Sequence, residues 1–230
     1  MKKTLRFDIL TIFPSMFSSY LDESMIKRAK SRKLLDIRVH DLRDWAEGKH
    51  HKVDDRPFGG GPGMLMKVEP FYRALKSLKA LKSAKKDRPY VILLSPRGTR
   101  FTQRVAERLV KHKQIIFLCG RYEGIDQRVT DHLVDEEISV GDYVLTGGEL
   151  PAMTILDAVS RLVPGVVGKE ASIVEESHSS EGFIEHPHYT RPEDFSPKKG
   201  EHWSVPPVLL SGDHKKIGEW RSKHAKNVKK

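Results

Sequence analysis

Short apolar runs alternate with amphipathic stretches between residues 7 and 163, and this alternation constrains the fold more than any other feature of the chain. The spacing of the apolar residues changes from about two to about 3.6 and back, which is typical of βαβ units. We therefore predict an α/β protein with a mostly parallel sheet. The expected strands are Phe7–Phe13, Leu35–His40, Tyr90–Leu94, Ile115–Cys119 and Ile138–Val140. The expected helices are Glu23–Lys33, Glu69–Lys85, Thr102–Lys113, Asp126–Val134 and a segment that begins at Pro151.

The texture of the sequence changes after Pro164. Residues 168–200 are rich in Ser, Glu, His, Pro and Gly and have little periodicity, so we expect a linker or a mobile segment. Residues 205–230 begin apolar, turn at 211–213 and become a basic helix that contains Trp220. This last part is too small to hold a core of its own, so we expect it to pack on the main domain or on a second subunit.

The charge balance favours a polyanionic partner. The chain has 41 Lys and Arg against 31 Asp and Glu, a formal net charge of +10. Charge alone also fits a basic protein whose lysines are merely solvated. The single cysteine, Cys119, excludes an internal disulfide and a cysteine-rich zinc site, and it fits a reducing cytoplasm. We expect no membrane span and no leader, because Arg6 and Asp8 interrupt the apolar N-terminal run.

Three glycine-containing segments, 93–98, 118–126 and 138–153, each follow an expected strand. One such segment is more often a turn than a site, but three at the carboxyl ends of parallel strands predict one shared pocket. Neither a dinucleotide-binding GxGxxG with its acidic partner nor a phosphate-binding GxxxxGK[ST] is present, which argues against a dinucleotide enzyme and an NTPase. Residues 51–64 hold a further glycine-rich loop. It is either a surface hinge or a loop that closes on a nucleotide, with Phe58 available for stacking and Arg56 for a phosphate or base edge.

Six motifs carry a specific resemblance. They are GGGPGM at 59–64, LLSPRG at 93–98, CGRYEGID at 119–126, SVGDYVLTGGELPAM at 139–153, PHYTRP at 187–192 and VPPVLLSGDH at 205–214. Their order is that of the bacterial tRNA (guanine-N1)-methyltransferases, which the chain resembles over nearly its whole length. The resemblance implies a trefoil-knotted (SPOUT) S-adenosylmethionine-dependent methyltransferase that works as a homodimer, with the active site at the subunit interface. It implies a knotted donor-binding domain at 1–167, a flexible linker at 168–185 and a small helical tRNA-binding domain at 186–230.

The resemblance also implies where the methyl donor binds. The implied donor site consists of Leu94, Ser95, Pro96, Gly120, Tyr122, Glu123, Val140, Gly141, Tyr143, Leu145, Gly147, Gly148 and Pro151. Side chains at positions 147 and 148 would occupy the space that the donor needs, so we expect bulkier residues there to impair donor binding more than folding. Some relatives need Mg²⁺, which carboxylates would suit, but no ligand spacing in the sequence locates a metal.

Methyl transfer to N1 of guanine needs a base for the N1 proton and a cation for the negative charge that grows toward O6. The resemblance implies Arg161 as the cation and Glu176 as the base, where most relatives have aspartate; Glu175 is the neighbouring alternative. It places Glu123 beside the donor. Without the resemblance, Arg161 would be a cation at a helix C-terminus, Glu176 a solvated carboxylate, and Glu123 an ion-pair partner of Arg121 or Arg128.

The implied substrate is the guanine immediately 3′ of the tRNA anticodon, position 37, when another guanine precedes it. The implied tRNA-binding residues are Asp55, Arg56, Gly59, Gly60, Gly61, Met64 and Arg191. Lys215, Lys216, Arg221, Lys223, Lys226, Lys229 and Lys230 would add phosphate contacts. Relatives usually continue beyond this point with a longer basic helix, so we expect either weaker RNA affinity here or other lysines that take over the role of that helix. Two other functions stay open: an RNA-binding protein that has lost catalysis, and a knotted methyltransferase for another RNA position.

Overall fold

The computed structural model describes residues 4–82, 88–168 and 176–228. The chain divides into two compact units, Met1–Gly168 (unit 1) and Lys169–Lys230 (unit 2), and each is described by itself. Within the expected linker, residues 169–175 lie outside the described residues, and so do Lys229 and Lys230.

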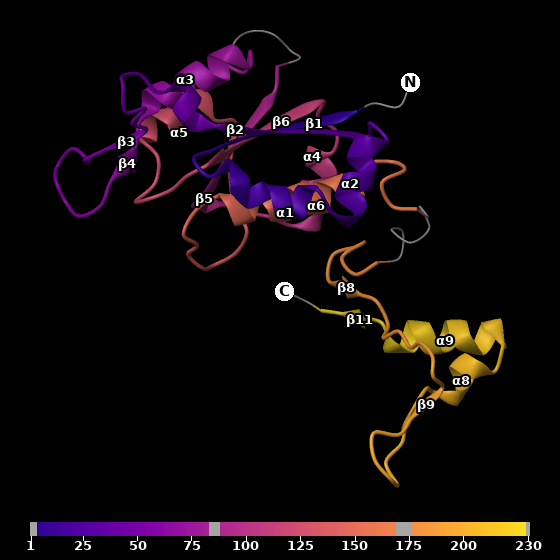
Figure 1. Ribbon diagram of the computed structural model, residues 1–230. Helices are drawn as coiled ribbons and strands as arrows, with labels where there is room; N and C mark the ends of the chain where they lie inside the picture. Colours follow the sequence, from indigo (N-terminus) through magenta and orange to yellow (C-terminus); the bar gives the residue numbers. More distant parts are fainter. Residues whose placement is uncertain (1–3, 83–87, 169–175, 229–230) are drawn as a thin grey trace. The chain divides into compact units, whose positions relative to one another are not determined.

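Unit 1 is built on a five-stranded sheet in which every pairing is parallel (Figure 1). The strands are β1 (Leu5–Thr11), β2 (Leu35–Asp41), β5 (Tyr90–Arg100), β6 (Gln114–Cys119) and β7 (Glu136–Ser139), in the order β2-β1-β6-β5-β7. The predicted α/β class and parallel sheet are confirmed, and all five expected strands are present with bounds that differ by a few residues. Strand β6 is central and buried on both faces, which explains its nearly continuous apolar sequence.

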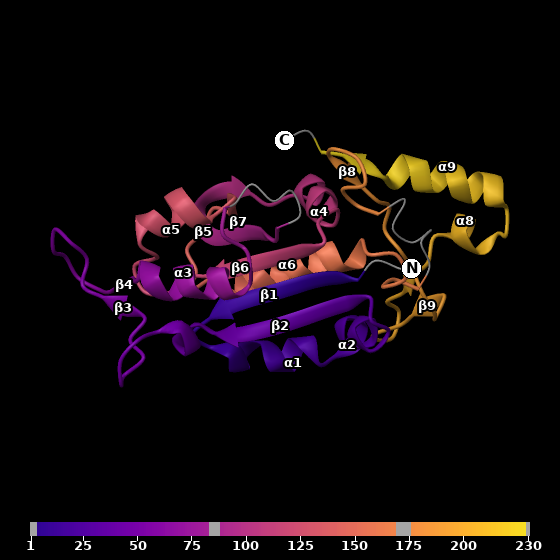
Figure 2. The same ribbon diagram turned by 90° about the horizontal axis from the view of Figure 1, so that it is seen from above.

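Helices cover both faces of the sheet (Figure 2). One face packs against the 3-10 turn Pro14–Phe17 and four helices. These are α1 (Ser18–Leu21), α2 (Ser24–Ser31), α4 (Gln103–Leu109) and α6 (Glu149–Arg161). The other face packs against α3 (Val68–Ser77), α5 (Gln127–Leu133) and the 3-10 turn Leu42–Trp45. Each layer buries its own apolar cluster, so the sheet separates two hydrophobic cores.

The helices differ from the expected bounds: α2 ends at Ser31 and α4 at Leu109, two and four residues early, and two others differ for local reasons. Helix α3 ends at Ser77, before the expected Lys85, because Lys79 adopts a left-handed backbone (φ +57°) and Ala80 N–H returns to the Leu75 carbonyl. Helix α6 begins at Glu149, two residues before the expected Pro151. Proline still lies in the first turn, where a missing N–H leaves no helical bond unmade.

Strand β5 is longer than expected. The sequence predicted a strand that ends at Leu94 and a loop over 93–98, but β5 pairs with β7 through Leu94 and pairs with it again from Thr99. The segment between is a bulge that leaves the ladder and rejoins it. Gly98 lies where a Cβ would come within 2.6 Å of the Glu137 carbonyl oxygen, so glycine permits the close approach of β7.

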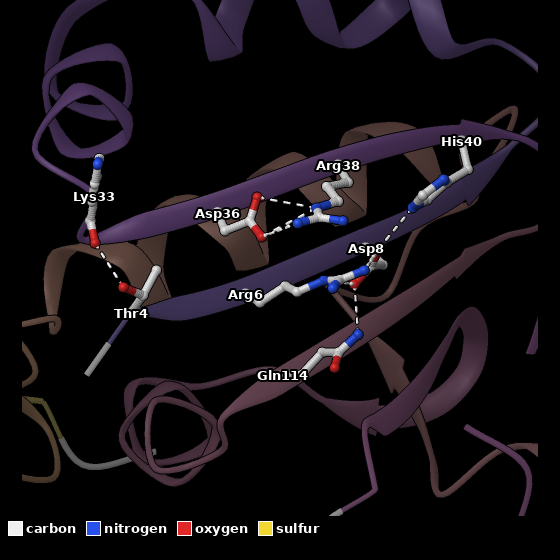
Figure 3. Close-up of polar contacts among 8 residues, drawn as sticks. All are labelled: Thr4, Arg6, Asp8, Lys33, Asp36, Arg38, His40 and Gln114. Atoms are coloured by element: carbon white, nitrogen blue, oxygen red, sulfur yellow. Dashed lines mark hydrogen bonds and ion pairs between the residues drawn. The ribbon is translucent and has the colours of Figure 1, made fainter. Parts of the chain in front are cut away.

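The sheet also carries a cluster of polar side chains on β1, β2 and β6 (Figure 3). The Asp8 carboxylate, fully buried, accepts hydrogen bonds from Arg6 Nε at 2.7 Å and from Gln114 Nε2 at 2.8 Å, and it lies 2.7 Å from His40 Nε2. Burial alone raises the pKa of Asp8, but the hydrogen bonds with His40, Arg6 and Gln114 outweigh it and lower the pKa to about 2. The carboxylate is therefore held charged inside the sheet.

Unit 2 consists of short paired strands and two helices. Strand β8 (Phe183–Ile184), within the expected linker, pairs with β11 (Lys226–Asn227), and β9 (Asp194–Phe195) pairs with β10 (Trp203–Ser204). Helix α8 spans Pro207–Leu210 and α9 spans His214–His224, which contains Trp220. Asp213 caps α9 by accepting from the Lys215 and Lys216 N–H groups, both at 3.1 Å. Among residues 176–228 none is fully buried, as befits a piece too small for a core.

Candidate functional site

A cavity of about 630 Å³ lies at the bulge of β5 and at the carboxyl ends of β6 and β7 in unit 1. All thirteen residues that the sequence analysis assigned to the donor site line it. They are Leu94, Ser95, Pro96, Gly120, Tyr122, Glu123, Val140, Gly141, Tyr143, Leu145, Gly147, Gly148 and Pro151. The three glycine-containing segments thus meet in one pocket, at the sheet edge where open parallel sheets hold their ligands. That these residues bind the donor stays a prediction.

Other residues line the same cavity and were not predicted as site residues. They include Leu65, Arg97, Arg121, Gln127, Ser139, Val144 and Thr146. Most of them lie inside the six motifs quoted in the sequence analysis. The full motifs therefore predict the cavity lining better than the thirteen residues chosen from them. Ser139 is buried, and its Oγ donates to the Gly141 carbonyl at 3.0 Å, which fixes the turn that enters the third segment.

Arg121, in the cavity wall, forms an ion pair with Glu149, which lies buried behind it. Glu149, the first residue of α6, is fully buried; its Oε2 accepts from Arg121 Nε at 2.9 Å and its Oε1 accepts from Thr11 Oγ1 at 2.7 Å. Arg121 Nη1 also donates to the Thr146 carbonyl at 3.3 Å. The segments after β1, β6 and β7 are therefore joined by one polar network. No sequence signal marked this pair, because Glu149 and Arg121 each read as ordinary charged residues.

The glycines of the third segment also face close neighbours within the protein, in addition to the predicted donor, whose space they were expected to leave free. A Cβ on Gly148 would lie 2.7 Å from Cys119 Cα, and one on Gly147 would lie 2.6 Å from Glu149 Oε2. Gly148 N–H also donates to the Gly120 carbonyl at 3.0 Å. These glycines let the start of α6 approach the end of β6. A side chain at Gly148 would press on backbone, whereas one at Gly147 would meet the Arg121 and Glu149 side chains; the effect of either on donor binding stays a prediction.

The glycine-rich loop carries most of the predicted tRNA-binding residues and borders the cavity at one end. It runs between β3 (Asp54–Asp55) and β4 (Leu65–Met66), and Figure 2 shows it extending away from the sheet. Gly59, Gly60 and Gly61 have φ of +85°, +81° and +112° in open space, so their backbone conformation, not crowding, favours glycine. Phe58, Asp55 and Arg56 are exposed, and Phe58 is completely so.

Met64, at the end of this loop, is tied to the cavity wall. Its carbonyl accepts from the Glu123 N–H at 3.1 Å, and Met66 exchanges backbone hydrogen bonds with Gly124 and Asp126. The Glu123 side chain fills the space beside Gly63 where a Cβ would clash. The alternative for Glu123 was an ion pair with Arg121 or Arg128. Arg121 instead pairs with Glu149, and Arg128 pairs with Asp126.

The two residues predicted to carry out proton removal and charge stabilisation lie in different units. Arg161 is the last residue of α6 in unit 1, half-buried, at the helix end that favours a cation. Glu176 lies in unit 2 and is also half-buried. The alternative base Glu175 lies outside the described residues. The remaining predicted tRNA-binding residue, Arg191, is exposed in unit 2.

Over the described ranges, no group of three or more His, Cys, Asp or Glu side chains is arranged to hold a metal ion. The same part of the chain has no helix both long and apolar enough to cross a membrane.

Comparison with known proteins decides the family. The profile of the family described as tRNA (guanine-1)-methyltransferase TrmD matches residues 5–230. The chain belongs to this family. The predicted family and enzyme class, tRNA (guanine-N1)-methyltransferase, are thereby confirmed.

Individual TrmD-family proteins are similar over most of their length. A tRNA (guanine-N(1)-)-methyltransferase of Dehalococcoides mccartyi strain BAV1 is 51% identical over 221 residues, which cover 96% of this chain and 86% of the relative. Proteins of the same name from Bacillus subtilis and Clostridioides difficile are 48% and 47% identical, covering 96% and 98% of this chain and 87% and 94% of each relative.

Membership of the TrmD family implies S-adenosylmethionine as the methyl donor, and the cavity fits such a group. Its wall combines main chain at glycines with exposed aromatic rings, Tyr122 (52% exposed) and Tyr143 (57% exposed). Glycine allows backbone N–H and C=O groups to approach a ligand, and rings supply flat apolar surface. Glu123 adds a carboxylate at the rim, which suits a cationic ligand.

Proposed function

We propose that the protein is a cytoplasmic enzyme that transfers a methyl group from S-adenosylmethionine to N1 of the guanine immediately 3′ of the tRNA anticodon, position 37. The observation that carries this proposal is the single cavity lined by all thirteen residues assigned to the donor. Family membership supports tRNA guanine-N1 methylation, and the net charge of +10 suits an RNA substrate.

Each proposed residue has one task. When bound, S-adenosylmethionine supplies an electrophilic methyl group on a sulfonium centre. Glu176 would accept the N1 proton of guanine, which leaves the N1 electron pair free to take the methyl group. Arg161 stabilises the negative charge at O6, and Glu123 orients the donor through its positive charge. Reaching N1 requires an unpaired guanine, which the anticodon loop provides once the base is extruded.

The proposed architecture is that of the knotted methyltransferases, with a trefoil knot in the C-terminal part of unit 1 and a small helical tRNA-binding domain. We propose a homodimer with the active site at the subunit interface. Support comes from apolar side chains exposed beside the cavity: Tyr143, Val144 at 86%, Leu145 at 38% and Leu150 at 53%. Exposed apolar patches of this kind mark interaction surfaces. We include a dependence of methyl transfer on Mg²⁺ in the proposal; loss of transfer after addition of a chelator would support it.

The test is methyl transfer from labelled S-adenosylmethionine to a tRNA with guanine at position 37, with a tRNA carrying adenine there as the negative substrate. Arg161→Ala and Glu176→Gln should lose transfer, and Glu176→Asp should keep it. Glu181→Gln is the matched control, because Glu181 is an exposed carboxylate in the same segment. Donor binding with no transfer by the wild type would contradict the proposal and favour either another RNA position or an RNA-binding protein without catalysis. Full activity of Glu176→Gln would remove Glu176 as the base.

A further inference from the structure

A second cavity, of about 520 Å³, lies wholly within unit 2 and has no part in the proposed chemistry. One wall is the segment 186–191. Further lining comes from α8 and α9 and includes Leu210, Ile217, Trp220 and Arg221. Both parts of the lining belong to the same unit, so the cavity exists independently of how the two units are arranged.

Aromatic rings form one side of this cavity. The Trp220 ring meets the edges of Tyr189 and His186, with ring centroids 6.2 Å apart in both pairs. One face of Trp220 is already covered by His224, stacked at 4.0 Å with an interplanar angle of 23°. Tyr189 remains 49% exposed. The cluster is thus held in place by its own packing and leaves one aromatic side chain available to a flat ligand.

Two guanidinium groups, of Arg191 and Arg221, line the same cavity. Both side chains are exposed, and neither has an ion-pair partner within the described ranges. Glu193 is the one acidic residue of the lining. Residues 186–230 contain ten Lys and Arg against five Asp and Glu, a net charge of +5, so the surroundings also favour an anion.

We propose that this cavity binds a single unpaired nucleotide of the tRNA substrate, with its base against Tyr189 and its phosphate between Arg191 and Arg221. The inference rests on the proposed function, which makes RNA the polyanion that reaches unit 2. Aromatic stacking with arginine on the adjacent phosphate is how single-stranded nucleotides are held without reading a full sequence. The cavity therefore contributes affinity and register for the RNA, not chemistry.

The experiment measures the Kd of the full-length protein for tRNA by fluorescence anisotropy. Tyr189→Ala and Arg221→Ala should each raise the Kd about tenfold. Matched controls are Phe195→Ala, which removes a ring of equal exposure (50%) outside the cavity, and Lys199→Ala, which removes an exposed cation of the same unit. Both controls should bind within about twofold of wild type. Tyr189→Phe, which keeps the ring, should bind as tightly as wild type and shows that a loss in Tyr189→Ala comes from the missing ring.

A second measurement follows the cavity directly. In a Trp45→Phe, Trp203→Phe background, Trp220 is the single tryptophan, and titration with an anticodon stem-loop should quench its emission in proportion to binding. The inference is overturned if Tyr189→Ala and Arg221→Ala bind tRNA as tightly as the controls. It is also overturned if Tyr189→Ala changes only the sedimentation of the RNA-free protein, which would make the cavity a subunit contact. If the wild type bound tRNA without methylating it, the proposed function would be contradicted, but the tRNA Kd values of the variants could still be compared.

Discussion

Arg121 Nε lies 2.9 Å from Glu149 Oε2; the Glu149 side chain is buried and that of Arg121 is 16% exposed. The pair joins the segment after β6 to the first turn of α6, and the Thr146 carbonyl and Thr11 hydroxyl complete its hydrogen bonds. Two of the three segments that line the donor cavity are thus fixed by one ion pair. Glu149 also lies at the positive end of the α6 dipole, which further favours its charge.

Glu149→Gln should lower the free energy of unfolding by about 2 kcal/mol, because it leaves the largely buried Arg121 guanidinium without its counter-charge. It should also weaken donor binding, since Arg121 holds the Thr146 carbonyl. Urea unfolding and calorimetric titration with S-adenosylmethionine measure the two effects. Glu107→Gln, in an exposed pair with Arg104, is the matched control and should change stability by no more than about 0.5 kcal/mol. Equal stability of the two variants would show that the buried pair contributes nothing.

Gly148→Val should destabilise the fold by at least about 2 kcal/mol, because its Cβ would press on the backbone of Cys119. The backbone at Gly148 is right-handed (φ −81°), so the cost is steric and not conformational. Gly218→Ala is the control: a Cβ there has nothing within 4 Å, and alanine inside α9 should stabilise by about 0.5–1 kcal/mol. Thermal unfolding compares the two. A Gly148→Val protein that melts with wild type yet binds no donor would restore the earlier expectation that the glycine serves the ligand.

Asp8 should make stability depend on acid pH. Its pKa in the folded protein is about 2, below the ordinary value of 3.8, so its stabilising contribution is complete above about pH 4 and is lost as the pH falls through 2. At pH 7, Asp8→Asn should cost on the order of 2 kcal/mol, and the difference from wild type should shrink toward pH 2. Urea unfolding at a series of pH values measures this.

Asp36→Asn serves as the control for Asp8, because Asp36 lies in the same cluster but its side chain is 38% exposed and forms its ion pair with the exposed Arg38 (Figure 3). Its effect on stability should be small at every pH. A pH-independent difference between Asp8→Asn and wild type would mean that Asp8 contributes through packing and not through its charge.

Cys119 should resist alkylation in the folded protein. Burial raises the pKa of the Cys119 thiol, the nearby Glu149 carboxylate raises it further, and Arg121 only partly opposes them. Thiolate is the reactive form, so we expect modification by iodoacetamide at less than about a tenth of the rate of an exposed thiol. Ser222→Cys supplies that exposed thiol on α9. Rapid labelling of both cysteines in native buffer would contradict the buried position of Cys119.

The sequence predicts the sheet and the cavity because both rest on local signals. Five apolar runs at strand spacing specify parallel strands, and glycine after a strand specifies a turn at the ligand edge. It does not predict the features that depend on distant neighbours. Gly148 is required by Cys119, and Asp8 is held by His40 and Gln114, which lie 32 and 106 residues away along the chain. Pro96 and Gly98 predict a loop, yet the strand resumes after them because β7 pairs with both sides.

The way in which β5 leaves β7 at Leu94 and meets it again at Thr99 limits how the donor can enter. Because residues 95–98 are anchored at both ends by the same neighbouring strand, we expect this side of the cavity to stay in place when the donor enters. Opening it would require breaking the sheet ladder on one side or the other. The opposite side, residues 141–147, is held by a few side-chain bonds and carries the exposed Tyr143 and Val144. We expect the pocket to open by a movement of residues 141–147 about Gly141, which requires the hydrogen bond from Arg121 to the Thr146 carbonyl to break.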